Sequence, residues 1–390
     1  MNAHVPFGSV CSLQNGRAFK PSEWSDDGTP IVRIQNLNDE SKPFNYCDFE
    51  VEQRFHVDSG DLLFSWSGTP GTSFGAFFWN RGKGFLNQHI FRVDVDEGVT
   101  DKDYLRHAIN SKLNMIIDQA HGGVGLKHIT KGKLEAIEIY HPPLPEQKRI
   151  AAILDKADAI HRKRQQAIQL ADEFLRSVFL EMFGSAEYPI VRIGEMLEKG
   201  ILVLHKDGNH GSLYPRREDF GDRGIPFVST KCFTDDGSID DQLVPRLKEE
   251  KANQLRIGWI EKGDVLLAHN ATVGPVGLYD GQYERALIGT SLTAFRPNQS
   301  DLVSEYLYAA LKSMFFQGQL FQLMKQTTRN QVPITAQRTL KIPLPPIGLQ
   351  KNFAKILRKH LELRKVSENH GGMALNEFSS LAQYAFRGEL

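Results

Sequence analysis

Residues 142–184 read PPLPEQKRIAAILDKADAIHRKRQQAIQLADEFLRSVFLEMFG, and this stretch predicts one long helix. The prolines favour an extended approach, and neither Gly nor Pro follows between Glu146 and Phe183. A helix of that length would rise about 57 Å at about 1.5 Å per residue, too long for one compact domain. Its apolar stripe therefore needs a partner. The predicted stripe is formed by Ile150, Ile153, Ala157, Ile160, Ala167, Ala171, Phe174 and Val178.

The partner is a second copy of the same pattern. Residues 345–357 read PPIGLQKNFAKIL and repeat residues 142–154 at an offset of 203. The strand GDLLFSWSGTPG (60–71) recurs at the same offset as GDVLLAHNATVG (263–274). The chain is therefore an internal two-fold repeat, each half a globular head followed by a long helix.

These repeats predict an α/β (α+β) fold with two mixed α/β heads and two long antiparallel helices that form a coiled-coil spacer. The expected divisions are residues 1–141, 142–184, 185–342 and 343–390. Within the last, Asn369-His370-Gly371-Gly372 predicts a break near 369–372, because each interior glycine costs a helix about 1 kcal/mol. In the heads, short runs such as IVRIQNL (31–37) and HIFRVDV (89–95) read as strands.

Composition indicates a protein of the cytoplasm. Basic and acidic residues are balanced at 47 each, so any basic surface for a polyanion must be local. Cys11, Cys47 and Cys232 are widely spaced, which favours reduced thiols over disulfides or a zinc site. The N-terminus lacks a signal-peptide pattern, and no run approaches the roughly 18 apolar residues of a membrane span.

The paired proline-led helices and the Gly-Asp strand in each half resemble the specificity subunits of type I DNA restriction-modification systems. The resemblance covers nearly the whole chain, although the second helix has Gly348-Leu349-Gln350 where Glu146 opens the first. It implies that each head is a target-recognition domain for one half of a bipartite, asymmetric site in double-stranded DNA. The helices would set the spacing and bind two methyltransferase subunits, with motor-nuclease subunits in the full complex. It further implies no catalysis, and S-adenosylmethionine, ATP and Mg²⁺ only on partner subunits.

Motifs agree with a non-catalytic chain. The nearest string to an Asn/Asp-Pro-Pro-aromatic methyltransferase motif is His141-Pro142-Pro143-Leu144, and no phosphate-binding Gly-x4-Gly-Lys-Ser/Thr loop occurs. Two alternatives remain: a specificity module of another modification or defence system without a motor-nuclease, and a structural coiled-coil protein.

DNA binding needs Lys and Arg for phosphates and polar side chains for base edges. In the first head the candidates are Arg17, Lys20, Gln35, Asn36, Ser65, Trp66, Ser67, Thr69, Lys127, His128 and Lys131. In the second head they are His205, Lys206, His210, Arg216, Arg217, Thr230, Lys231, His269, Asn270, Thr272, Arg329, Asn330 and Gln331. The candidates for binding the partner are Glu146, Gln147, Arg149, Gln350 and Lys351.

Two residue types have a competing structural interpretation. Trp66 suits a core aromatic as well as a groove contact. Arg92 and Arg296 recur in similar strands, which favours framework ion pairs over base readout.

Overall fold

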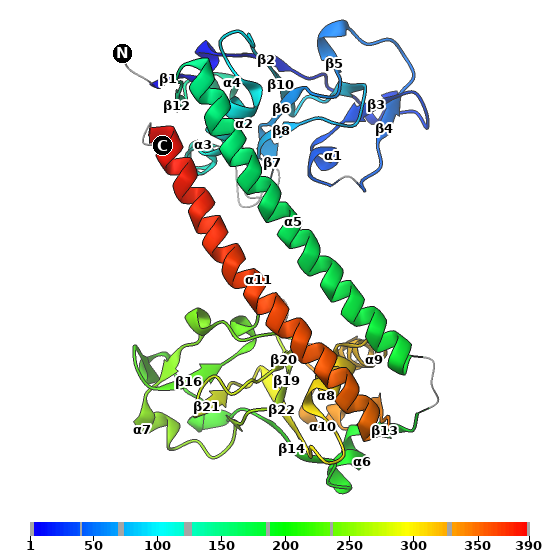
Figure 1. Ribbon diagram of the computed structural model, residues 1–390. Coiled ribbons are helices and arrows are strands. Elements are labelled where there is room, and N and C mark those ends of the chain that lie inside the picture. The colour runs from blue at the N-terminus through cyan, green and yellow to red at the C-terminus, as the bar shows by residue number, and fades with distance from the viewer. Residues whose placement is uncertain are drawn as a thin grey trace. The chain divides into compact units, whose positions relative to one another are not determined.

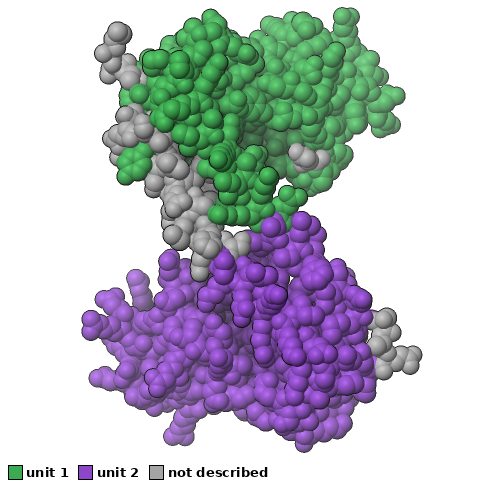
Figure 2. Space-filling view, viewed as in Figure 1, with its two compact units in different colours: residues 1–166, 368–390 green, residues 167–367 purple. Residues whose placement is uncertain are grey.

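The computed structural model describes residues 4–39, 41–68, 74–120, 127–184, 188–234, 237–325 and 330–387. The chain divides into two compact units, which Figure 2 colours separately. Unit 1 contains residues 1–166 and 368–390, and unit 2 contains residues 167–367. Each unit holds one α/β head, called head 1 and head 2 below, together with parts of both long helices.

Head 1 is built on two four-stranded sheets (Figure 1). The first has the strand order β2 (Ser12–Asn15), β10 (Ile90–Asp94), β6 (Leu62–Ser65), β8 (Gly75–Phe78). The second has the order β4 (Asn45–Cys47), β3 (Thr29–Val32), β9 (Gly84–Leu86), β5 (His56–Val57). Short pairs join β1 (His4–Pro6) to β12 (Glu138–Tyr140) and β7 (Ser67–Gly68) to β11 (Lys127–His128). The helices are α1 (Ile34–Asn38), α2 (Lys102–Asn110), α3 (Leu113–Gln119) and α4 (Lys131–Glu135).

Head 2 repeats this plan, which confirms the predicted internal repeat. Its first sheet has the order β14 (Leu202–Asp207), β22 (Leu292–Pro297), β19 (Val265–Asn270), β20 (Thr272–Leu278). The second has the order β15 (Phe220–Gly221), β17 (Arg246–Leu247), β16 (Ile225–Val228), β21 (Ala286–Ile288), β18 (Trp259–Ile260). A short two-stranded pair joins β13 (Ile190–Arg192) to β23 (Lys341–Pro343), as β1 joins β12 in head 1. The helices are α6 (Ile193–Glu198), α7 (Glu249–Ala252), α8 (Ser304–Lys312), α9 (Met314–Lys325) and α10 (Ile334–Gln337).

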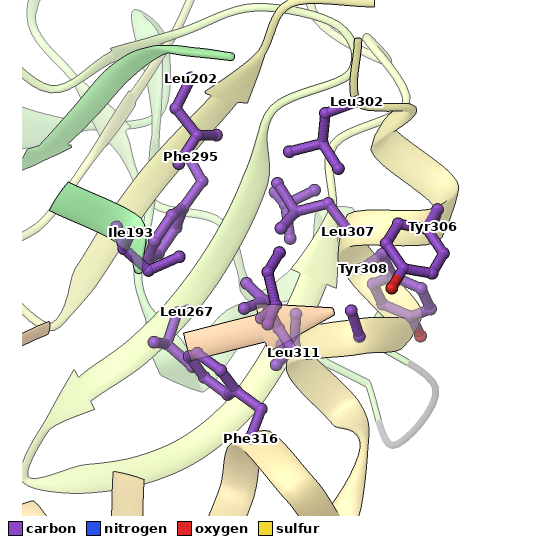
Figure 3. Close-up of a cluster of buried hydrophobic side chains, with 14 of the residues drawn as sticks. Ile193, Leu202, Leu267, Phe295, Leu302, Tyr306, Leu307, Tyr308, Leu311 and Phe316 are labelled. Carbon is purple, nitrogen blue, oxygen red and sulfur yellow. The ribbon is translucent and has the colours of Figure 1, made fainter. Parts of the chain in front are cut away.

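The core of head 2 forms where α8 and α9 pack on the first sheet. In Figure 3 Leu202, Leu267 and Phe295 come from the strands of that sheet, and their side chains lie in the same cluster as those from α8 and α9. Leu307 and Leu311 of α8 are fully buried there. Burial of one such leucine stabilises the fold by about 1.5–3 kcal/mol.

The repeated Gly-Asp motif has the same turn geometry in both heads. Gly60 and Gly263 have φ angles of 95° and 93°, in the left-handed region that favours glycine. The following aspartate closes the turn, because Asp61 Oδ2 accepts from the Asp58 N–H at 2.8 Å. Asp264 Oδ2 likewise accepts from Glu261 at 2.8 Å. The motif is therefore a structural start to β6 and β19.

The strand register corrects one detail of the repeat. Phe91-Arg92 and Phe295-Arg296 match in sequence, but Leu62 pairs with Val93 whereas the equivalent Val265 pairs with Phe295. The two Phe-Arg pairs are thus displaced by two residues, which keeps the same face of the strand.

The predicted ion pairs of these arginines are confirmed. Arg92 bonds Asp94 at 2.7 and 3.1 Å. Arg296 makes two bonds to the fully buried Asp264, at 2.7 and 2.8 Å.

The two long helices are α5 (Leu144–Phe183) and α11 (Ile347–Arg387). The break expected near 369–372 is wrong, since α11 is helical through these positions (Figure 1). The glycine penalty is a propensity of about 1 kcal/mol per residue, which the rest of a 41-residue helix can outweigh.

Contacts within each unit confirm that the helices are antiparallel. In unit 2, the Phe183 ring centroid lies 5.6 Å from that of Phe353. Eleven residues earlier on α5, Asp172 bonds His360 Nε2 at 3.0 Å. Moving back along α5 therefore means moving forward along α11. In unit 1, Ile150 near the start of α5 shares a core with Phe386 near the end of α11.

The predicted stripe on α5 is only partly correct. Ile150 is buried, but Phe174 is 64% exposed and Ala171 is also exposed. In unit 2 the predicted Val178 does pack against the core, and Leu175, Phe179 and Phe183, which the stripe did not include, lie there with it. A straight helix drifts about 20° per heptad from a strict seven-residue repeat, so a stripe extrapolated over many turns rotates away from its partner.

Candidate nucleic-acid interface

In head 1, two segments far apart in sequence meet at one place. Pairing of β7 with β11 sets Ser67 opposite His128. The Ile129 N–H also donates to the Trp66 carbonyl at 3.1 Å. The candidates around 65–67 and around 127–131 are therefore neighbours in space.

Head 2 has the same arrangement. Asn270 pairs with Gln331 through an isolated antiparallel bridge. The Val332 N–H donates to the His269 carbonyl at 2.8 Å. Each of these four residues lies 203 positions after its counterpart in head 1. We call each arrangement a loop pair: residues 65–68 with 127–129 in head 1, and 268–272 with 330–332 in head 2.

The head 2 loop pair contains a backbone conformation that is unfavourable for its residue. Ala271 has a φ of 63°, the one positive value at a non-glycine position in the part of the chain that the structure describes. A left-handed conformation costs a residue with a Cβ roughly 1–2 kcal/mol. Such strain is concentrated at ligand sites, where the surrounding structure holds it in place.

Side chains of the loop pairs differ in exposure. His128, Thr272 and Asn330 are exposed, and Asn270 and Gln331 are half-buried, so all five can meet a ligand. In contrast Ser65, Ser67 and His269 are buried.

The buried members of the loop pairs have internal roles. Ser65 Oγ donates to the Ser67 carbonyl at 3.3 Å. His269 Nδ1 bonds the Val332 carbonyl at 3.0 Å. Trp66 is half-buried, and its ring is stacked on Phe91 with centroids 5.8 Å apart, which supports the core interpretation.

Three candidates cannot be placed fully. Thr69 and Arg329 lie outside the described residues. Lys127 lies in β11, but only its backbone is described.

The remaining cations of head 1 divide between exposed and internally bonded groups. Lys20 is exposed. Arg17 forms a salt bridge with Glu23, and its guanidinium lies 4.7 Å from the centroid of the Phe19 ring. Lys131 Nζ donates to the Leu13 carbonyl at 2.8 Å. Lys20 is therefore the better phosphate candidate of the three, because the other two must give up internal bonds.

Asn36 is corrected from a base contact to a structural residue. The strand predicted over 31–37 ends at Val32 and continues as α1. Asn36 is 2% exposed, accepts from the Arg33 N–H and donates to two carbonyls. Its neighbour Gln35 is half-buried and donates to the Pro43 carbonyl at 3.3 Å.

His205 is also corrected. Its side chain is 3% exposed, with Nε2 3.1 Å from Gln337 Oε1. Burial lowers the pKa of His205 to about 4, so the ring is neutral and buried at neutral pH. Exposed polar groups of the same region are Lys206, His210, Arg216 and Arg217, with His210 bonded to Asp207 at 2.7 Å.

A cleft of about 480 Å³ in head 2 gathers candidates from separate segments. Thr230 and Lys231 follow β16, and Thr272 begins β20, yet all three line this cleft. Lys312, at the end of α8, lines it too and was missed by the sequence analysis. Its position at a helix C-terminus is explained equally well by the helix dipole, so sequence alone gave no separate signal.

Two predicted partner contacts, Gln147 and Gln350, are wrong. Both are fully buried at the starts of α5 and α11. Gln147 Oε1 accepts from the Asp101 N–H at 2.9 Å, and its Nε2 donates to the Pro142 carbonyl at 2.8 Å. Gln350 does the same with Val303 and Pro345, at 2.9 and 2.8 Å. These amides fasten each helix to its own head.

The neighbours of these glutamines remain accessible. Arg149 and Lys351 are exposed, and Glu146 is bonded to Arg149 at 2.8 Å. These three remain candidate partner contacts.

Two other kinds of site are absent from the described residues. They contain no group of three His, Cys, Asp or Glu side chains placed to hold a metal ion. Nor do they include a helix that is both long and apolar enough to cross a membrane.

Comparison with known proteins gives one consistent result. The family model "Type I restriction modification DNA specificity domain" matches residues 3–170 and 187–369. The Escherichia coli EcoBI type I specificity subunit is 24% identical, over 99% of this chain and 85% of that protein. The Methanocaldococcus jannaschii MjaVIII specificity subunit is 25% identical, over 77% of this chain and 72% of that protein.

Solved structures show the same fold. The S subunit of a type I system from M. genitalium has a TM-score of 0.62 at 16% identity, and covers 98% of this chain and 95% of its own. The family model matches both heads and most of both helices. The chain therefore belongs to the family of type I restriction-modification DNA specificity proteins.

Proposed function

We propose that this chain is the DNA-reading subunit of a type I restriction-modification complex, with each head reading one half of a bipartite, asymmetric site. The observation that carries the proposal is the loop pair. Both heads build it at the same place in the repeat, with the same backbone bonds and different side chains.

The side chains of the two loop pairs suit different bases. Asn270 and Gln331 carry amides, which can bond an adenine edge in a bidentate manner. The matched Ser67 and His128 carry a hydroxyl and an imidazole, and of these only His128 is exposed. Because one frame presents unlike groups, the two half-sites should differ in sequence.

Phosphate contacts would come from the exposed cations of each head. Lys20 in head 1 and Lys206, Arg216, Arg217 and Lys231 in head 2 are exposed. Such contacts fix the position on the duplex but carry no sequence information.

The helices are proposed to bind two methyltransferase subunits at quasi-equivalent surfaces. Large apolar side chains remain exposed at matched positions of the two helices, Ile160 at 43% in unit 1 and Leu363 at 64% in unit 2. On α11, Ile356 and Val366 are exposed on the same side. Exposed apolar stripes of this kind mark protein-binding surfaces.

The same proposal assigns chemistry to the partners. S-adenosylmethionine, ATP and Mg²⁺ would be bound by the methyltransferase and motor-nuclease subunits, and this chain would be non-catalytic and act in the cytoplasm. A specificity module of a system without a motor-nuclease differs only in its partners. A structural coiled-coil protein gives no reason for matched loop pairs.

The test is a methylome. The chain is co-expressed with a type I methyltransferase subunit, and methylated adenines are mapped. The wild type should give a two-part motif with an unread gap. The double variant N270S/Q331H, which places the head 1 residues in head 2, should change only one half of the motif.

A matched control uses Gln254→Ala, because Gln254 is exposed in head 2 and lies outside its loop pair. This variant should keep both half-sites. A continuous motif in the wild type, or an N270S/Q331H motif identical to that of the wild type, would contradict the proposal.

A further inference from the structure

A buried polar network lies directly beneath the loop pair of head 2. Gln337 Nε2 donates to Thr293 Oγ1 at 3.0 Å and to the Val332 carbonyl at 3.1 Å. Gln337 Oε1 faces His205 Nε2 at 3.1 Å. His269 Nδ1 completes the set by bonding the same Val332 carbonyl at 3.0 Å. All four network side chains are at most 3% exposed.

Head 1 has apolar side chains at all four matched positions. Strand register and helix backbone bonds match the residues as follows: His205 with Leu13, His269 with Trp66, Thr293 with Phe91, and Gln337 with Leu134. Leu13, Phe91 and Leu134 are buried in the apolar core of head 1, and Trp66 packs against that core. The shared frame therefore does not require polar groups here.

Filling this space with polar side chains is energetically less favourable than filling it with apolar ones. Burial of a polar group is unfavourable unless it is fully hydrogen-bonded. Burial lowers the pKa of both histidines, so each ring is neutral and has a single N–H. Those N–H groups are used, and His205 Nδ1 and His269 Nε2 have no partner among the described residues. Stability alone does not account for such an arrangement.

The bonds of the network converge on the loop pair. Two of them end on the Val332 carbonyl, and the N–H of the same residue donates to the His269 carbonyl. Asn270 and Gln331, the two amides of the loop pair, are the immediate neighbours of these residues. The network thus fixes the backbone from which both amides project.

We infer that Gln337 is a positioning residue for sequence reading by head 2, acting through the Val332 and His269 backbone on Asn270 and Gln331. The inference rests on the proposed function. Gln337 does not touch DNA in this scheme, and it sets the geometry of groups that do. The directional bonds to the Val332 backbone can hold that geometry.

The experiment is Gln337→Leu, which installs the residue that head 1 uses. The readout is the methylome of the complex, expressed as the ratio of methylation at cognate sites to methylation at sites with one changed base. For the half-site read by head 2 this ratio should fall about tenfold, which is within the range for one misplaced base contact. The half-site read by head 1 is the internal control and should keep its ratio.

A second variant separates positioning from simple destabilisation. Q337L leaves the His205 N–H buried and unpaired, whereas the double variant H205L/Q337L removes that group and restores the apolar pair of head 1. A positioning role predicts that the double variant regains thermal stability but keeps the relaxed half-site. Should Q337L fail to fold, the double variant alone gives the answer.

Two outcomes overturn the inference. One is a folded Q337L or H205L/Q337L protein with an unchanged ratio at both halves. The other is recovery of full discrimination together with stability in the double variant. A wild-type motif that is not bipartite would instead contradict the proposed function, so the two failures are distinguishable.

Discussion

Replacement of Gln350 by leucine removes the side chain that joins α11 to head 2. Gln350 is fully buried and makes three bonds, one to the Val303 N–H at 2.9 Å and two to carbonyls, at 3.2 and 2.8 Å. Leucine has a similar size but no polar atom. The backbone groups stay in place and become unpaired.

The expected loss of stability follows from the backbone groups that Gln350 no longer bonds. An intramolecular hydrogen bond contributes about 1 kcal/mol net, and a buried donor left without a partner costs about 1–3 kcal/mol. Apolar burial of leucine offsets part of the loss. We expect unfolding of unit 2 to become easier by about 3 kcal/mol, or roughly 6–12 °C in Tm for a unit of this size.

The assay is thermal unfolding combined with amide hydrogen exchange, which reports each unit separately. Exchange should accelerate around Val303 and the start of α11. The matched control is the adjacent Lys351→Leu, because Lys351 is exposed and should change stability by no more than about 0.5 kcal/mol. Gln147→Leu should reproduce the effect in unit 1, where the same bonds join α5 to head 1.

One result would refute this reasoning. If Q350L unfolded like wild type but no longer bound a methyltransferase subunit, Gln350 would be a partner contact after all. A loss below about 1 kcal/mol would likewise show that the three bonds do not hold the helix.

Three further changes test other parts of the structure. Phe179→Ser should lower the free energy of unfolding by about 2–3 kcal/mol, because Phe179 packs on Phe353. The control Phe174→Ser should have almost no effect on thermal unfolding, because Phe174 is exposed. Equal effects of the two changes would place the helix seam elsewhere. Burial lowers the pKa of His205 to about 4, below its unfolded value of about 6.5. Its contribution to the free energy of unfolding, roughly 3 kcal/mol, is therefore complete above pH 6.5 and is lost as the pH falls toward 4. His205→Leu should therefore flatten the acid side of the stability curve measured by urea unfolding, and an unchanged slope would exclude this role. Asp264→Asn breaks the buried pair with Arg296 and should cost about 3 kcal/mol in thermal unfolding; a smaller loss than that of an exposed Asp→Asn change would contradict the framework role.

The internal repeat was predictable because the same motifs occur in both halves of the sequence at a fixed offset. Identical spacing of the Gly-Asp strand and of the proline-led helix predicts two equivalent heads. The first sheets have the same strand order in both, and the second sheet of head 2 has one additional edge strand, β15. The framework role of Arg92 and Arg296 was also predicted, because both arginines recur in similar strands, and both form ion pairs in the structure.

Burial of polar side chains was not predictable from residue type. Asn36 was predicted to contact a base because amides suit base edges, and Gln147 and Gln350 were predicted to contact a partner because they recur at the starts of the two helices. In the structure each amide satisfies backbone groups where a strand or loop turns into a helix. For Gln147 and Gln350 the N–H groups belong to residues 46 and 47 positions away, so no local pattern reveals them. The partners of Asn36 are nearby in sequence, but they come together only once the chain turns into α1.

For the candidate segments, the sequence shows that they recur in both halves but not which of their side chains are exposed. Residues 60–71 align with 263–274, and 327–335 takes the place of 125–130; in the structure Ser67 pairs with His128 and Asn270 with Gln331. Which side chain points outward depends on a bridge of one or two residues, where a shift of one position reverses every side chain.

The core of unit 1 is completed by a side chain from a distant part of the sequence. The Phe386 ring lies 5.8 Å from that of Tyr104, and its side chain is 6% exposed within the core of head 1. Recombination that replaced only residues 1–141 would place a different head in contact with the unchanged Phe386. A replacement head would therefore need an aromatic surface on α2 that is compatible with Phe386 to keep this core.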